Sequence, residues 1–100
     1  MQSIQTAHKV AWPDGDINDN FSFSTVHPDG VFSFTFRYFN GHWNCWCTLP
    51  DGEVRPAGVY PGVPSWTEYT DYGLIFGTQL SEIGRDSLYM TSLYILTWEK

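Results

Sequence analysis

The stretch that decides the fold is residues 31–48, which read VFSFTFRYFNGHWNCWCT. Two alternating runs flank Asn40-Gly41, and this dipeptide favours a two-residue type I′ hairpin turn. Such a turn makes residues whose numbers sum to 81 face each other across the two strands. One face of the hairpin is then apolar throughout, with the pairs Tyr38 and Trp43, Phe36 and Cys45, Phe34 and Cys47, and Phe32 and Leu49. Because turn chemistry and side-chain period agree, we predict an antiparallel hairpin whose apolar face builds the core.

A second turn, His27-Pro28-Asp29-Gly30, joins this hairpin to an earlier alternating run. Two registers are open for it. A two-residue loop places Phe23 opposite Phe34 and Phe21 opposite Phe36, whereas a type I turn with a bulge slips the register by one and puts the neighbouring serines there. We favour the first register, because burying two Phe side chains is worth a few kcal/mol.

Three further strands are predicted towards the C-terminus, at residues 53–55, 72–77 and 88–98. Pro56 caps the first of them or marks the edge of a sheet. The last is apolar on both faces, which is typical of a strand that lies centrally or meets another chain.

The chain divides into two parts. Residues 1–19 are polar, show no clean period and are predicted to form an irregular N-terminal arm. Residues 20–100 are predicted to form a single β domain. Short strands separated by turns every 8–12 residues indicate an all-β fold, a small antiparallel sandwich or partly open barrel of about six strands.

Composition and charge exclude several classes. Aromatic residues make up 18% of the 100 residues and charged residues 16%, which argues against a disordered chain or a coiled coil. The net charge is −6, and the five basic residues are scattered, so we expect no direct binding to nucleic acid or to an anionic membrane. No apolar run approaches the roughly 20 residues of a membrane helix, and the first residues lack the pattern of a signal peptide.

No reactive constellation is evident. Cys45 and Cys47 point the same way on a strand, so we interpret them as free core thiols; a zinc half-site is the alternative, but no second ligand pair has metal spacing. The acidic run at 14–20 matches three positions of a calcium loop and lacks its Gly and Glu. The three histidines stand in no triad context. We predict no catalytic residue, no metal and no cofactor.

Aromatic residues outside the predicted core are the more informative class. Rings in loops and in the arm either pack as satellite core or form a contact surface, because Trp and Tyr dominate interface hot spots. The candidate contact residues are Trp12, Tyr60, Trp66 and Trp98.

Several stretches carry a resemblance to a known family. They are Phe32–Phe39 with Trp43, Leu49–Gly52, Ala57–Tyr60, Tyr72–Leu74 and Tyr94–Trp98. Over roughly residues 20–98 the chain resembles the small baseplate plug proteins of contractile-tailed bacteriophages. The resemblance implies a non-enzymatic virion component, synthesised in the bacterial host cytoplasm and located in the tail baseplate. Its implied partners are hub, tube and neighbouring baseplate subunits, with homo-oligomers within a symmetric assembly.

Two other functions fit the composition. An acidic phage protein of this size could inhibit a host defence nuclease by mimicking nucleic acid, as anti-CRISPR proteins do, although its carboxylates are dispersed. Exposed aromatic rings could instead stack on sugars in a carbohydrate-binding module. We expect the baseplate function.

Overall fold

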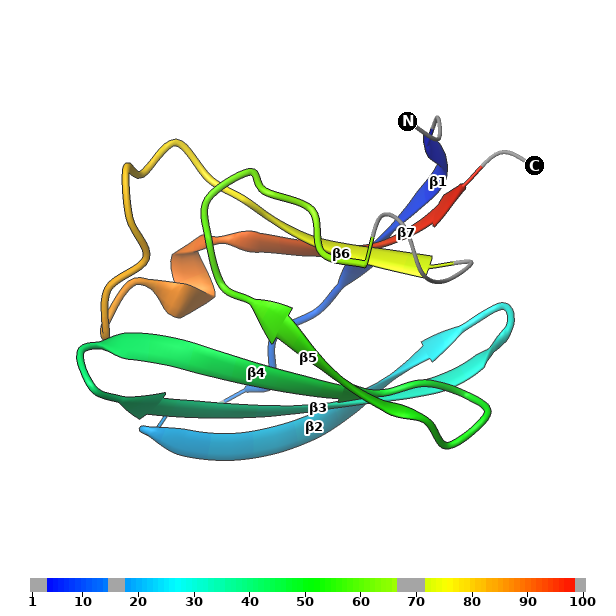
Figure 1. Cartoon of the computed structure of the whole chain (residues 1–100), viewed down its shortest axis with the longest axis horizontal. Helices are drawn as coiled ribbons and strands as arrows, with labels where there is room; N and C mark the ends of the chain where they lie inside the picture. Colours follow the sequence, from blue (N-terminus) through cyan, green and yellow to red (C-terminus); the bar gives the residue numbers. More distant parts are fainter. Residues whose placement is uncertain (1–3, 15–17, 67–71, 99–100) are drawn as a thin grey trace.

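The computed structural model describes residues 4–14, 18–66 and 72–98. They form two antiparallel sheets that lie one over the other (Figure 1), and Ile4 pairs with Trp98 where the described chain begins and ends. The strands are β1 Ile4–Val10, β2 Asn20–His27, β3 Gly30–Phe39, β4 His42–Thr48, β5 Val54–Gly58, β6 Tyr72–Gly77 and β7 Ser92–Trp98. The three-stranded sheet has the order β1-β7-β6 and the four-stranded sheet the order β2-β3-β4-β5. The prediction of a small all-β sandwich is confirmed.

Both predicted hairpin registers are confirmed. Every β3–β4 pair sums to 81, including Phe34 with Cys47 and Phe36 with Cys45. Asn40 and Gly41 both have positive φ, at 55° and 80°, as a type I′ turn requires. Across β2 and β3, Phe23 lies opposite Phe34, so the loop at the first turn has two residues. The apolar face therefore extends over β2, β3 and β4.

The prediction of an irregular arm is wrong for Ile4–Val10. These residues form β1, which pairs antiparallel with β7 from Ile4–Trp98 to Val10–Leu93. The inward positions Thr6 and His8 are polar, and this hides the period of two that marks a strand.

The predicted final strand is too long at its start. Leu88–Met90 form a single 3₁₀ turn, and β7 begins only at Ser92. Apolar side chains at consecutive positions fit both a buried strand and a short helical turn, so the sequence pattern did not distinguish the two. β7 is the central strand of its sheet, in line with its two apolar faces. β5 extends through Pro56 and lies at the edge of the other sheet, where a residue without an N–H is tolerated.

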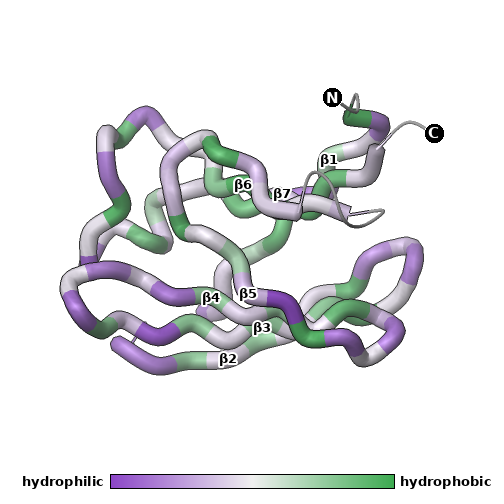
Figure 2. Tube along the Cα trace, viewed as in Figure 1, coloured by the Kyte–Doolittle hydropathy of each residue, from purple (hydrophilic) through white to green (hydrophobic). Residues whose placement is uncertain are grey.

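The core fills the space between the two sheets. It contains Phe32, Phe34, Phe36, Cys45 and Cys47 from the four-stranded sheet, packed with Leu74, Phe76, Leu93 and Ile95 from the three-stranded sheet. Figure 2 shows the hydrophilic residues gathered mainly in the turns and connections. In the part of the chain that the structure describes, no helix has the length and apolar character to cross a membrane.

Candidate binding cleft and apolar hollow

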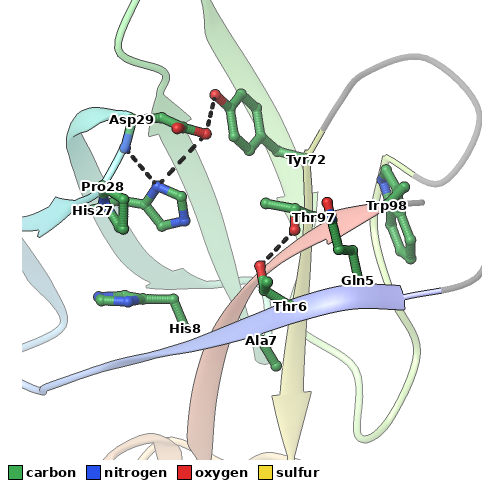
Figure 3. A pocket seen from close by; sticks show the side chains of 10 residues that line it. All are labelled: Gln5, Thr6, Ala7, His8, His27, Pro28, Asp29, Tyr72, Thr97 and Trp98. Atoms are coloured by element: carbon green, nitrogen blue, oxygen red, sulfur yellow. Dashed lines mark hydrogen bonds and ion pairs between the residues drawn. The ribbon is translucent and has the colours of Figure 1, made fainter. Parts of the chain in front are cut away.

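One end of the sandwich opens as a cleft of about 630 Å³ between β1 and the turn that follows β2 (Figure 3). Strand β1 contributes residues 5–8, and the turn contributes residues 27–29. The lining residues are Gln5, Thr6, Ala7, His8, His27, Pro28, Asp29, Tyr72, Thr97 and Trp98. The cleft therefore brings together both sheets and residues far apart in the sequence.

Polar contacts across the cleft hold the two sheets together. The Tyr72 hydroxyl on β6 donates a hydrogen bond to the Asp29 carboxylate at 2.9 Å (Figure 3). The rings of His8 on β1 and His27 on β2 meet edge to face with 5.1 Å between centroids. These contacts link β2 and the turn after it to two strands of the opposite sheet, β6 and β1.

His27 is the most perturbed group of the cleft. It is only 5% exposed, and its Nδ1 accepts a hydrogen bond from the Asp29 backbone N–H at 3.1 Å. That bond selects the neutral form with the proton on Nε2. Burial lowers the pKa of His27, and the Asp29 carboxylate 3.9 Å away does not offset this. The nearby His8 lowers the pKa further.

We predict that acid destabilises the protein through His27. Its pKa is lower in the folded state than the ordinary 6.5 of the unfolded chain, so the unfolded chain binds more protons as pH falls through 6.5. The free energy of unfolding should therefore decrease over that range, and His27→Gln should remove this decrease. Urea titrations at a series of pH values measure it. His42→Gln, which changes an exposed histidine, is the control; the prediction fails if wild type and His27→Gln respond alike to pH.

The cleft does not supply a metal site from the described residues, where no group of three or more His, Cys, Asp or Glu side chains converges. Cys45 and Cys47 are buried free thiols, as predicted. Of the acidic run considered as a calcium loop, residues 15–17 lie outside the described residues.

The two thiols should be inert in the folded protein. Burial raises the pKa of Cys47 to about 12, and burial together with its neighbour Cys47 raises the pKa of Cys45 further. Since the thiolate is the nucleophile, Ellman's reagent at about pH 8 should modify neither thiol in the native protein and both in denaturant. Val54→Cys, at an exposed position, supplies a reactive control. Rapid native reaction of Cys45 or Cys47 would show that the hairpin face is open.

The four predicted contact residues lie in different surroundings. Trp12 packs on the core, and its indole N–H donates to the Thr91 carbonyl oxygen at 2.8 Å. The Trp66 indole N–H donates to a carbonyl oxygen of β5 at 2.7 Å. Trp98 is only 6% exposed, whereas Tyr60 is 60% exposed. Of the four, Tyr60 has the accessibility of a contact residue.

An apolar hollow on another flank was not predicted. It has a volume of about 600 Å³ and lies beside the connection between β6 and β7. Leu80, Met90 and Tyr94 supply its larger side chains, with Gly77, Thr78, Gln79 and Ser92 completing it. Met90 is 62% exposed, and the neighbouring Tyr89 is also exposed. None of the described residues that line the hollow is charged, although the chain carries a net charge of −6.

Comparisons of the chain with protein-family models, with curated proteins and with solved structures found no match. Its function therefore has to follow from its own residues and from the resemblance stated above.

Proposed function

We propose that this chain is a non-enzymatic structural protein of a contractile-tailed bacteriophage, and that it packs between hub, tube and neighbouring subunits of the tail baseplate. The choice of the tail baseplate as the assembly rests on the resemblance to baseplate plug proteins. The stretches that carry the resemblance contribute to β3, β4, β5, β6 and β7, so they belong to the body of the sandwich.

The observation that supports a packing function best is the apolar hollow. Exposed apolar surface without charge is typical of the centre of a protein–protein interface, where Tyr and Met are enriched and acidic residues are depleted. Leu80 and Met90 both line the hollow, and both side chains are exposed to solvent, so a partner could cover them. An acidic protein that keeps one concavity uncharged has a surface suited to a protein partner.

The hollow is placed where a partner has access to it. It lies beside the edge of the three-stranded sheet, on the connection that leads from Gly77 to Ser92. Covering it would bury the remaining exposed parts of the Met90 and Leu80 side chains, which are together worth about 1.5–3 kcal/mol. A few side chains carry most of the binding energy in an interface, and Tyr, which lines the hollow as Tyr94, is enriched among them.

Co-purification with tail proteins tests the proposal. The tagged chain, produced together with the tail genes of its phage, should be recovered with hub or tube proteins. A phage that lacks the gene should form defective tails. Normal infectious particles without the chain would overturn the proposal.

Variants of the hollow test the surface itself. Leu80→Asp with Met90→Lys should reduce recovery of tail proteins at least tenfold, because two buried charges replace two apolar anchors. Val54→Ser is the control, since it changes an exposed apolar side chain on the other sheet. Circular dichroism confirms that both variants fold. Equal recovery with both variants would exclude the hollow as the contact surface.

A further inference from the structure

We infer that the free edge of β2 pairs with the β2 edge of a second copy of this chain, giving a two-fold symmetric dimer with a continuous eight-stranded sheet. The inference starts from the four sheet edges. An exposed edge offers unpaired N–H and C=O groups to another strand, and proteins block such edges with charges, prolines, bulges or covering segments.

Three of the four edges are blocked. β1 carries Lys9 and an irregular register between Ile4 and Thr6. β5 has only five residues and contains Pro56. The edge of β6 is covered by the preceding connection, in which Gly62 N–H donates to the Phe76 carbonyl oxygen at 2.9 Å and Ser65 N–H to the Leu74 carbonyl oxygen at 2.8 Å.

Within the described ranges, β2 shows none of these protections. Its eight residues, NFSFSTVH, contain no Lys, Arg, Asp, Glu or Pro, and its pairing with β3 runs without a bulge. Among the described residues, those of β3 alone pair with β2. Phe21 and Phe23 are only partly buried at this edge. The strand is therefore long, regular, uncharged and bordered by incompletely covered rings.

The hairpin fixes which backbone groups face outwards. The two-residue turn makes His27 and Gly30 a hydrogen-bonded pair, and such pairs recur at every second residue. The Tyr38 N–H donates to the Asp19 carbonyl oxygen at 2.7 Å, which continues the same alternation at the far end. Odd-numbered residues of β2 thus bond to β3. The N–H and C=O groups of Asn20, Ser22, Ser24 and Val26 point to the free edge.

These groups complement each other in one antiparallel register. When the two-fold axis passes through Phe23, Asn20 lies opposite Val26 of the second copy and Ser22 lies opposite Ser24. Each of the four outward-facing residues of one copy then lies opposite an outward-facing residue of the other copy. Moving the axis to Ser24 places Asn20 opposite Pro28, which has no N–H to donate.

Side chains and charges agree with this register. On the inner face, Phe23 meets Phe23 of the second copy and Phe21 meets Thr25, so the partly exposed rings become covered. Asp19 lies across from His27, whereas the register centred on Ser24 would place Asp19 opposite Asp29. The chosen register therefore avoids a like-charge pair between the two acidic chains.

This inference does not depend on the proposed function. A baseplate with cyclic symmetry has head-to-tail contacts, whereas the β2 dimer is isologous. The dimer would be the state of the free chain. It would cover the β2 edge until the chain joins a baseplate.

Sedimentation or light scattering of the full chain measures the dimer. We expect twice the 11.5 kDa mass of the chain, with a dissociation constant on the order of 10⁻⁴ M because the interface is small. Ser22→Lys with Ser24→Lys, and separately Ser22→Glu with Ser24→Glu, should each give monomers. Mixing the two variants should restore a dimer, which loss of folding would not permit. Thr35→Lys, on the same face of β3, should still dimerise.

Cysteine cross-linking tests the register. A mixture of Ser22→Cys and Ser24→Cys chains should form a disulfide between unlike chains, and neither variant alone should, since each Cys faces a Ser in its own homodimer. A wild-type chain that stays monomeric up to about 1 mM would overturn the inference. Cross-linking of either single variant alone would overturn the register.

Discussion

Replacing Phe36 by alanine should lower the free energy of unfolding by about 3–5 kcal/mol. Phe36 has no exposed surface, and its ring lies 5.2 Å from Phe21, 5.4 Å from Trp12 and 6.0 Å from Phe76 between centroids. It therefore joins the four-stranded sheet to β6 and to the segment after β1. Truncation removes these contacts together and leaves a cavity that surrounding rings cannot fill. Urea denaturation followed by tryptophan fluorescence measures the change.

Phe39 provides the matched control on the same strand. Its side chain is 45% exposed on the other side of the sheet. Phe39→Ala should change the free energy of unfolding by no more than about 0.5 kcal/mol. Similar losses for both variants would mean that the even-numbered face of β3 is not the core.

Replacing Gly73 by alanine should cost about 1–3 kcal/mol of folding free energy. A Cβ atom at Gly73 would lie 2.4 Å from Cζ2 of Trp98 and 3.1 Å from the Ser65 carbonyl oxygen. Trp98 is nearly fully buried, so its indole has little room to move away. Thermal and urea unfolding both report the loss.

Two comparisons make this expectation specific to the indole. Gly77→Ala, at the end of the same strand, adds a Cβ with 3.5 Å to its nearest atom and should be nearly neutral. In a Trp98→Leu background, Gly73→Ala should cost at least about 1 kcal/mol less than in the wild type, because contacting residues do not act additively. An equal cost in both backgrounds would contradict the close approach of Trp98 to Gly73.

The hairpins could be predicted because local chemistry and pattern agree there. Asn40-Gly41 specifies a turn type, and the turn type specifies which side chains share a face. In the first hairpin the turn residues allowed two registers, and the burial of Phe21 and Phe23 decided between them. Where a local signal exists and the apolar pattern supports it, the register follows from the sequence.

β1 was missed because its inner face is apolar only at Val10, where the strand ends. Thr6 and His8 point into the cleft, where the Thr6 hydroxyl hydrogen-bonds that of Thr97 and the His8 ring contacts His27. An apolar period of two therefore does not appear in this strand. Trp12 follows β1 after one residue, and its partly buried ring packs against the core.

The cleft and the hollow could not be located from the sequence. His27 and Asp29 share one turn, but Tyr72 reaches them only because the two sheets stack, and the Asp29–Tyr72 bond spans 43 positions. Leu80 lies in a polar stretch, and Met90 lies in a segment that was predicted to be a strand. No feature of the sequence therefore indicated that the two side chains are neighbours. Long-range proximity of this kind is set by topology rather than by motif.

The measurement that tests the account most directly is the set of cross-strand nuclear Overhauser effects in the isotope-labelled chain. Close Hα–Hα contacts occur at the non-hydrogen-bonded pairs of an antiparallel ladder. We predict such contacts between Phe36 and Cys45 and between Phe34 and Cys47, the pairs that place the aromatic face against the thiols. Contacts shifted by one residue, such as Phe36 with Trp46, or helical contacts within residues 31–48, would contradict the account.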